Sequence, residues 1–145
     1  MLFLLRLPAK TIQPATALMQ LHDITGTIID AAIDIHKRLG PGLLESVYQS
    51  ILIHELKKRG LRIESQVDIP VRWDGMSLNL GFRADLIVEG QVIVELKSVE
   101  KTAPVHRKQV LTYLKVSGHS VGLLLNFGEE LMKNGIYRWV NEHRG

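Results

Sequence analysis

Hydrophobic positions recur at helical spacing in two neighbouring segments near the start of the chain. The first runs from Asp23, a suitable N-cap, to Leu39, and its apolar residues share one helical face. The second covers residues 43–59 and has one broad apolar face. The tripeptide "GPG" at 40–42 separates the two segments, and Gly60 follows the second. Because glycine and proline end helices, the pattern predicts an antiparallel helix pair.

The hydrophobic period then changes to two. Odd-numbered positions are mostly apolar over 61–73, the dipeptide "DG" follows at 74–75, and even-numbered positions are mostly apolar over 76–88. Alternation of this kind predicts two half-buried strands, and Asp-Gly predicts a two-residue hairpin turn between them. In that register Trp73 pairs with Met76, so the apolar residues of both strands meet on one face.

A third strand is predicted in "QVIVELKSV", whose even-numbered residues are apolar. These residues share the core face of the preceding strand only if Val88 pairs with Val92 across a three-residue loop, because a slip of one residue exchanges the faces. Asp85 then lies opposite Glu95, with Cβ atoms roughly 5 Å apart, and Lys97 projects to the same side. The register therefore predicts two carboxylates and one ammonium on the face opposite the core.

Two interpretations of this charged face are open. Opposed carboxylates repel one another unless a positive group lies between them, and a divalent cation would meet that need and could polarise a phosphoryl oxygen. The nearby Lys97 could then orient a water molecule or stabilise charge on a phosphate. Alternatively, the face is simply solvated and Lys97 supplies the counter-charge. Spacing alone favours this simpler interpretation, because charged alternation is common on exposed sheets.

The segment "PVHRKQVLTYLKVSG" predicts a helix, with proline near its start and glycine after its end. His106, Gln109 and Tyr113 share one helical face, and Val110 and Leu114 mark the adjacent apolar stripe. The polar stripe is suited to binding a phosphate, a base or a water. Taken singly, His106 is more typical of a surface residue, and Tyr113 of half-buried packing.

Two final strands are predicted in "SVGLLLNFG" and "NGIYRWV". The complete pattern indicates a mixed α/β fold with a central, largely antiparallel sheet, the helix pair on one side and the later helix bridging back over the sheet. Residues 1–18 are predicted to be a poorly structured extension, and residues 19–145 a single domain.

Composition restricts the chemistry further. The 145 residues include 46% apolar and 23% charged residues, as in ordinary soluble globular proteins. The absence of cysteine excludes disulfides, thiolate zinc sites and cysteine nucleophiles, so any metal would be a hard cation held by oxygen or histidine ligands. The net charge of +3 is compatible with a polyanionic partner. Arg6 and Pro8 interrupt the first apolar run, so neither a signal peptide nor a membrane span is expected, and the cytoplasm is the default location.

At this point a family resemblance becomes visible. The segment "GPGLLESVY", with Gly42, Glu45 and Tyr48, resembles the signature of the bacterial GxxExxY family in the PD-(D/E)xK nuclease superfamily. The resemblance extends over about residues 24–140 and includes "RADLIVEG", "IVELKSVEK" and "QVLTYLK". It implies a restriction-endonuclease-like core, in which helices flank a mixed, mostly antiparallel sheet.

The resemblance also implies a site. A helix acid, a strand aspartate and an ExK pair would surround one or two Mg²⁺ (or Mn²⁺) ions, at Glu45, Asp85, Glu95 and Lys97. Gln109 and Tyr113 match a QxxxY element that would face the substrate, with His106 beside them. Without the resemblance, Glu45 would be read only as an acid favourable in a first helical turn. His36 and Tyr48 match family positions too, but core or interhelix packing is the preferred role for both.

Three functional hypotheses follow. The first is a magnesium-dependent nuclease acting on DNA, in which Lys97 positions the attacking water. The second is a nuclease-like module that binds nucleic acid or a protein partner without turnover, which a Lys97 buried in a salt bridge away from any cleft would favour. The third is a structural interaction protein with no metal affinity. Basic residues are scattered along the chain, so nucleic-acid contacts would be mostly to phosphate. A nuclease of this size could act as a homodimer.

Overall fold

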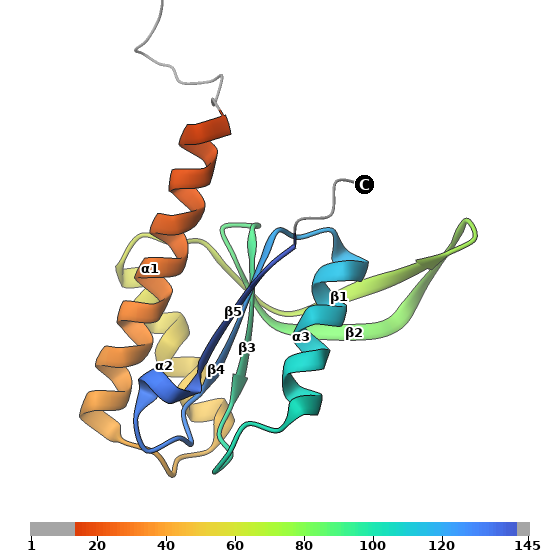
Figure 1. The fold of residues 1–145 in the computed structure, drawn as a ribbon. Coiled ribbons are helices and arrows are strands. Elements are labelled where there is room, and N and C mark those ends of the chain that lie inside the picture. The colour runs from red at the N-terminus through yellow and green to blue at the C-terminus, as the bar shows by residue number, and fades with distance from the viewer. Residues whose placement is uncertain (1–13, 142–145) are drawn as a thin grey trace, which may run out of the picture.

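A computed structural model describes residues 14–141 and shows one sheet with helices on both faces (Figure 1). Helices α1 (Pro14–Leu39) and α2 (Glu45–Lys58) pack on one face, and helix α3 (Pro104–Ser117) packs on the other. The predicted mixed α/β architecture is confirmed.

The sheet has five strands in the order β1-β2-β3-β4-β5. All neighbouring strands are antiparallel except β3 and β4, which are parallel because α3 crosses over between them. A short 3₁₀ helix (Met132–Gly135) precedes the last strand. The strands are β1 (Ile63–Trp73), β2 (Met76–Val88), β3 (Val92–Lys97), β4 (Val121–Asn126) and β5 (Ile136–Val140).

Both predicted hairpin registers are confirmed. Trp73 pairs with Met76 across the first turn, whose two central residues both have positive φ, as a type I′ turn requires. Val88 pairs with Val92 across the three-residue loop between β2 and β3. Local turn chemistry and hydrophobic alternation agree at both places, which is why the registers are readable from the sequence.

The first helix begins earlier than predicted. Asp23 is not its N-cap, since α1 starts at Pro14, nine residues before it. The intervening "ATALMQLH" is rich in good helix formers, and proline is tolerated in a first turn, so the helix propagates past the capping signal. The predicted extension over residues 1–18 therefore overlaps the helix at 14–18, and residues 1–13 lie outside the described residues.

Two apolar clusters hold the layers together. The larger lies between the sheet and the α1–α2 pair and includes Leu86 and Val88. The smaller lies under α3 and includes Ala84, with Phe82 packed against it. The alternation predicts both residues on the same face as Leu86, and this prediction is wrong, because Leu86 belongs to the larger cluster. The β1–β2 register shifts between Ile69 and Val71, close to these residues, and such an irregularity adds local twist. The hairpin tip projects beyond both clusters (Figure 1), and its Trp73 is 71% exposed.

Helix α3 lies unusually close to the sheet at Gly122 on β4. A Cβ atom at this position would stand 2.9 Å from Val110 Cγ1 and 3.2 Å from Leu114 Cδ1. The glycine therefore allows α3 to seat its apolar stripe directly on β4. This close approach places the two flanks of α3 over β3 on one side and β5 on the other.

Candidate metal and phosphate site

The two strand acids lie side by side where the β2–β3 ladder ends. Leu86 and Val94 form the last backbone pair, and beyond it the side chains take over the hydrogen bonding. The Asp85 carboxylate accepts a hydrogen bond from the Leu96 N–H (2.9 Å), and the Asp85 N–H donates to Glu95 Oε1 (3.3 Å). These bonds hold both carboxylates in place next to one another, in the arrangement that the predicted register implies.

The acidic face is covered by α3. Glu95 is only 4% exposed, and Tyr113 of α3 is 5% exposed with its ring packed against Phe82 (4.5 Å between centroids). A simply solvated face, the simpler interpretation of the charge pattern, is therefore wrong at Glu95. The alternation could not reveal this burial, because α3 reaches the face only through the parallel crossover.

Burial changes the protonation of Glu95. Desolvation, followed by the negative charge of Asp85 and a hydrogen bond with its side chain, raises the pKa of Glu95 to about 9. Glu45, at the start of α2, also has a raised pKa: burial is the largest cause, Lys97 opposes it and Asp85 adds to it. Glu45, Asp85, Glu95 and Lys97 are therefore close enough to influence one another electrostatically.

The paired acids suit a hard cation. Two neighbouring carboxylates repel one another when both are ionised, and burial keeps one of them protonated. A divalent cation that binds between them would compensate both negative charges and remove this repulsion. Within residues 14–141, no three acidic or histidine side chains gather closely enough to form a metal cluster. The closest contact is therefore between Asp85 and Glu95, and Glu45 lies near them without joining a three-residue cluster. Mg²⁺ commonly uses one or two carboxylates and takes its other ligands from water and substrate phosphates, so the pair still fits this ion.

Lys97 is half-buried at the end of β3. It forms no ion pair with any acid in the described part of the chain, although its charge acts on Glu45, Glu95 and His106. The condition that would favour a non-catalytic module, a buried Lys97 salt bridge, is thus not met. Its ammonium remains available for a substrate or a water.

Tyr113 and His106 come from α3 and border the acids. Burial and the negative charges of Glu95 and Asp85 raise the pKa of Tyr113 to about 12, so its hydroxyl keeps its proton. The Nδ1 of His106 accepts the Ala103 N–H (3.1 Å), and the His106 N–H donates to the Ala103 carbonyl (3.0 Å), which caps α3. Burial and the charge of Lys97 lower the pKa of His106. Gln109 is half-buried on the same helix.

A buried asparagine, which the sequence pattern did not single out, holds the segment between β3 and α3. Asn126 is fully buried, and its Oδ1 accepts the N–H groups of Val99 and Gly128, each at 3.0 Å. Its Nδ2 donates to Thr102 Oγ1 (2.9 Å). The available signal was one polar residue at the end of the apolar run "GLLLN". Asn126 thereby fixes the chain that links Lys97 to α3.

The loop before Glu45 is held just as firmly. The Tyr48 hydroxyl donates to the Gly40 carbonyl and accepts the Leu43 N–H (3.2 Å), and the Tyr48 ring stacks on Phe127 (4.5 Å). Ser98 Oγ donates to the Leu43 carbonyl (2.6 Å), which ties the loop to the strand end that carries Lys97. The predicted packing role of Tyr48 is confirmed.

His36 is buried too, and its contact is with a loop. Its Nε2 lies 2.8 Å from the Glu129 carbonyl oxygen in the segment after β4. The predicted packing role holds for its burial, but the polar partner is this loop and not the neighbouring helix. His36 therefore joins α1 to the segment after β4.

Comparison with protein families gives a match over most of the chain. The profile of the PD-(D/E)XK nuclease superfamily matches residues 22–139. No curated protein and no solved structure matches the chain. Within the described residues, no helix has the length and apolar character needed to cross a membrane. The superfamily match spans both strand acids, Lys97 and α3, and the chain belongs to the PD-(D/E)XK nuclease superfamily.

Proposed function

We propose that this protein is a metal-dependent nuclease of the GxxExxY type that hydrolyses DNA phosphodiester bonds in the cytoplasm. The observation that carries the proposal is the Asp85–Glu95 pair, which backbone bonds hold side by side under α3 with Lys97 on the same strand as Glu95. A nuclease-like function is what the superfamily supports. The acids and the lysine supply the chemistry that phosphodiester hydrolysis needs.

Asp85 and Glu95 would hold the cation, Mg²⁺ or Mn²⁺, and Glu45 would assist directly or through a water. When bound, such an ion polarises a phosphoryl oxygen and makes an attacking water more acidic. Glu95 would lose its proton on metal binding, because its pKa of about 9 reflects an unfavourable buried charge that the cation compensates.

The neighbouring side chains would act on the water and the phosphate. Lys97 would position the attacking water and stabilise the charge that develops on the phosphate. Tyr113 keeps a proton that it can donate to a phosphate oxygen. Gln109 and the Nε2 of His106, whose Nδ1 is occupied by the helix cap, would contribute further contacts to the substrate.

Cleavage of labelled single-stranded and double-stranded DNA, with Mg²⁺ or Mn²⁺, tests the proposal. We expect metal-dependent cleavage by the wild type and a fall in kcat of about 100-fold or more for Lys97→Ala, because one group that stabilises the transition state is lost. Lys57→Ala is the matched control: it is exposed at the far end of α2, about 18 Å along the helix from Glu45.

Two results would contradict the proposal. Absence of cleavage by the wild type with either metal and either DNA would favour a binding module in its place. Equal activity of the wild type and Lys97→Ala would show that Lys97 takes no part in the reaction.

A further inference from the structure

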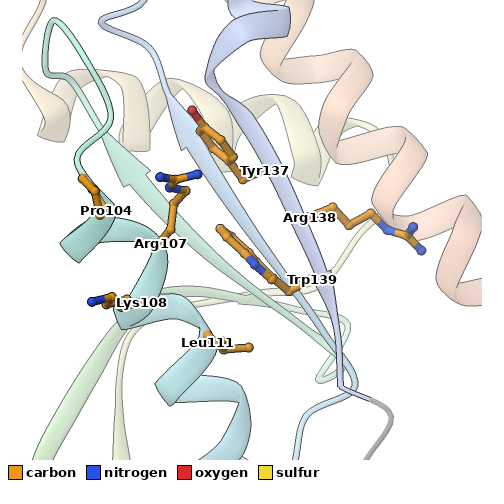
Figure 2. A pocket seen from close by; sticks show the side chains of 7 residues that line it. All are labelled: Pro104, Arg107, Lys108, Leu111, Tyr137, Arg138 and Trp139. Atoms are coloured by element: carbon orange, nitrogen blue, oxygen red, sulfur yellow. The ribbon is translucent and has the colours of Figure 1, made fainter.

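A groove lies on the flank of α3 that faces away from the acids, between this helix and the edge strand β5 (Figure 2). Its cavity volume is about 360 Å³. The helix side is formed by Pro104, Arg107, Lys108 and Leu111, and the strand side by Tyr137, Arg138 and Trp139. None of these residues has a role in the proposed catalytic site.

The strand side of the groove is an aromatic platform. Tyr137 and Trp139 are two residues apart, so they project from the same face of β5. Their ring centroids are 6.0 Å apart and their planes differ by 18°. Both side chains remain half-buried, and the Arg107 guanidinium carbon lies 5.5 Å from the Tyr137 ring centroid. Aromatic rings and arginine planes are the groups on which unpaired nucleobases stack.

The helix side of the groove is positively charged. Arg107 and Lys108 are both exposed, and neither forms an ion pair with an acid of the described residues. Exposed cations beside an aromatic platform match the two requirements of a single-strand binding groove, phosphate contact and base stacking. Figure 2 shows that the Arg138 side chain points away from Tyr137 and Trp139, toward the opposite face of β5.

The groove is also close to the acids. Glu95 pairs with Leu124, and Leu124 pairs with Tyr137, so Glu95 and Tyr137 occupy the same row of the sheet two strands apart. Two strand spacings correspond to about 10 Å. His106 on the acidic flank and Arg107 on the groove flank are consecutive in α3. One strand of nucleic acid that crosses the start of α3 would therefore contact both.

We propose that this groove binds single-stranded nucleic acid, with a base stacked at Tyr137 and Trp139 and phosphates at Arg107 and Lys108. Duplex nucleic acid fits this platform poorly because its bases are already paired and stacked. The conclusion that the nuclease substrate is single-stranded rests on the proposed function. The conclusion that the groove binds a single strand rests only on the residues of the groove.

Tryptophan fluorescence tests the groove directly, because the chain has two tryptophans and Trp73 lies at the distant hairpin tip. In the full-length Trp73→Phe protein, Trp139 is the one emitter left. We would titrate this protein, in EDTA to prevent cleavage, with oligothymidylate, oligouridylate and a duplex of equal length. Saturable quenching by an oligonucleotide, with binding about tenfold weaker for the duplex, is the expected result.

Two arginine variants in the same background separate stacking from general charge. Arg107→Ala should raise the Kd for the single strand about tenfold, since it removes a contact at the platform. Arg72→Ala removes the same charge from the β1–β2 hairpin, where Arg72 is exposed and outside the groove lining, and should change the Kd much less. Circular dichroism would check that both variants are folded.

Each alternative outcome has a definite meaning. Absence of quenching by both single strands, equal affinity for the duplex, or equal effects of the two arginine variants would overturn the groove proposal. Because the titration contains no metal, failure of the nuclease assay would leave a positive binding result intact. Cleavage of DNA without quenching of Trp139 would instead overturn the groove proposal and leave the proposed nuclease function intact.

Discussion

The protonation state of Glu95 depends strongly on its surroundings. Its pKa in the folded protein, about 9, lies above the ordinary value of 4.5, because the carboxyl is buried beside Asp85. Between these two pH values the folded chain holds a proton at Glu95 that the unfolded chain releases. The stability that this proton contributes is complete below about pH 4.5, and is lost as the pH rises toward 9.

Glu95→Gln should therefore raise the melting temperature of the metal-free protein at about pH 8, and should raise it much less at about pH 5, because the amide has no charge to bury. Differential scanning calorimetry in EDTA at the two pH values measures this. Added Mg²⁺ should stabilise the wild type and not the variant. Equal shifts at both pH values would show that Glu95 is already ionised in the folded protein.

Tyr48 acts through its hydroxyl as well as its ring. Tyr48→Phe leaves the Gly40 carbonyl and the Leu43 N–H without this partner, so we expect a loss of about 1–3 kcal/mol in the free energy of unfolding, measured with urea. Nuclease activity should fall too, because the loop leads directly into Glu45. Tyr137→Phe is the control for the stability measurement, since that hydroxyl makes no hydrogen bond with the described residues. An unchanged stability of Tyr48→Phe would mean that water replaces the hydroxyl.

Among the elements, α3 has the largest influence on both candidate sites. Its apolar stripe rests on β4, its Tyr113 flank covers the acids, and its Arg107 flank forms the groove with β5. A shift of this one helix would therefore change both surfaces together.

Gly122→Ala tests this coupling. The added methyl group would meet Val110 and Leu114, so we expect a destabilisation of about 1–3 kcal/mol and a measurable fall in cleavage as α3 moves away from the acids. Gly26→Ala in α1 is the matched control, because nothing lies within 4 Å of the added atom. That change should stabilise the helix by about 1 kcal/mol. A Gly122→Ala protein as stable and active as wild type would show that α3 is not held in place by β4.

In the whole molecule, the sheet acts as a divider between a structural layer and a functional layer. The α1–α2 pair buries most of the core on one face. The other face carries the acids, α3 and the groove. Glu45 belongs to the first layer, and the hydrogen bond between Ser98 and Leu43 joins its loop to the strand end at Lys97.

Some of this arrangement is readable from the amino-acid pattern alone. The pairings of Trp73 with Met76 and of Val88 with Val92 follow from alternation and from short turns, and they place Asp85 beside Glu95. These features depend on residues close together in the chain, where backbone sterics and side-chain period act directly. Glu45 was connected to the strand acids only through the family resemblance, since nothing local relates a helix start to a strand about 40 residues later.

The remaining features depend on contacts between distant segments. Glu95 is buried and has a raised pKa because α3 lies over the sheet face that carries the acids. The close packing of α3 on β4 in turn requires Gly122. The groove joins a helix near residue 107 to an edge strand near residue 138, and Asn126 satisfies groups from two separate loops. Local periodicity specifies which face of an element is apolar, but packing determines what covers the other face. For this reason the sequence predicts the paired acids, and the folded chain determines their protonation and the surface beside them.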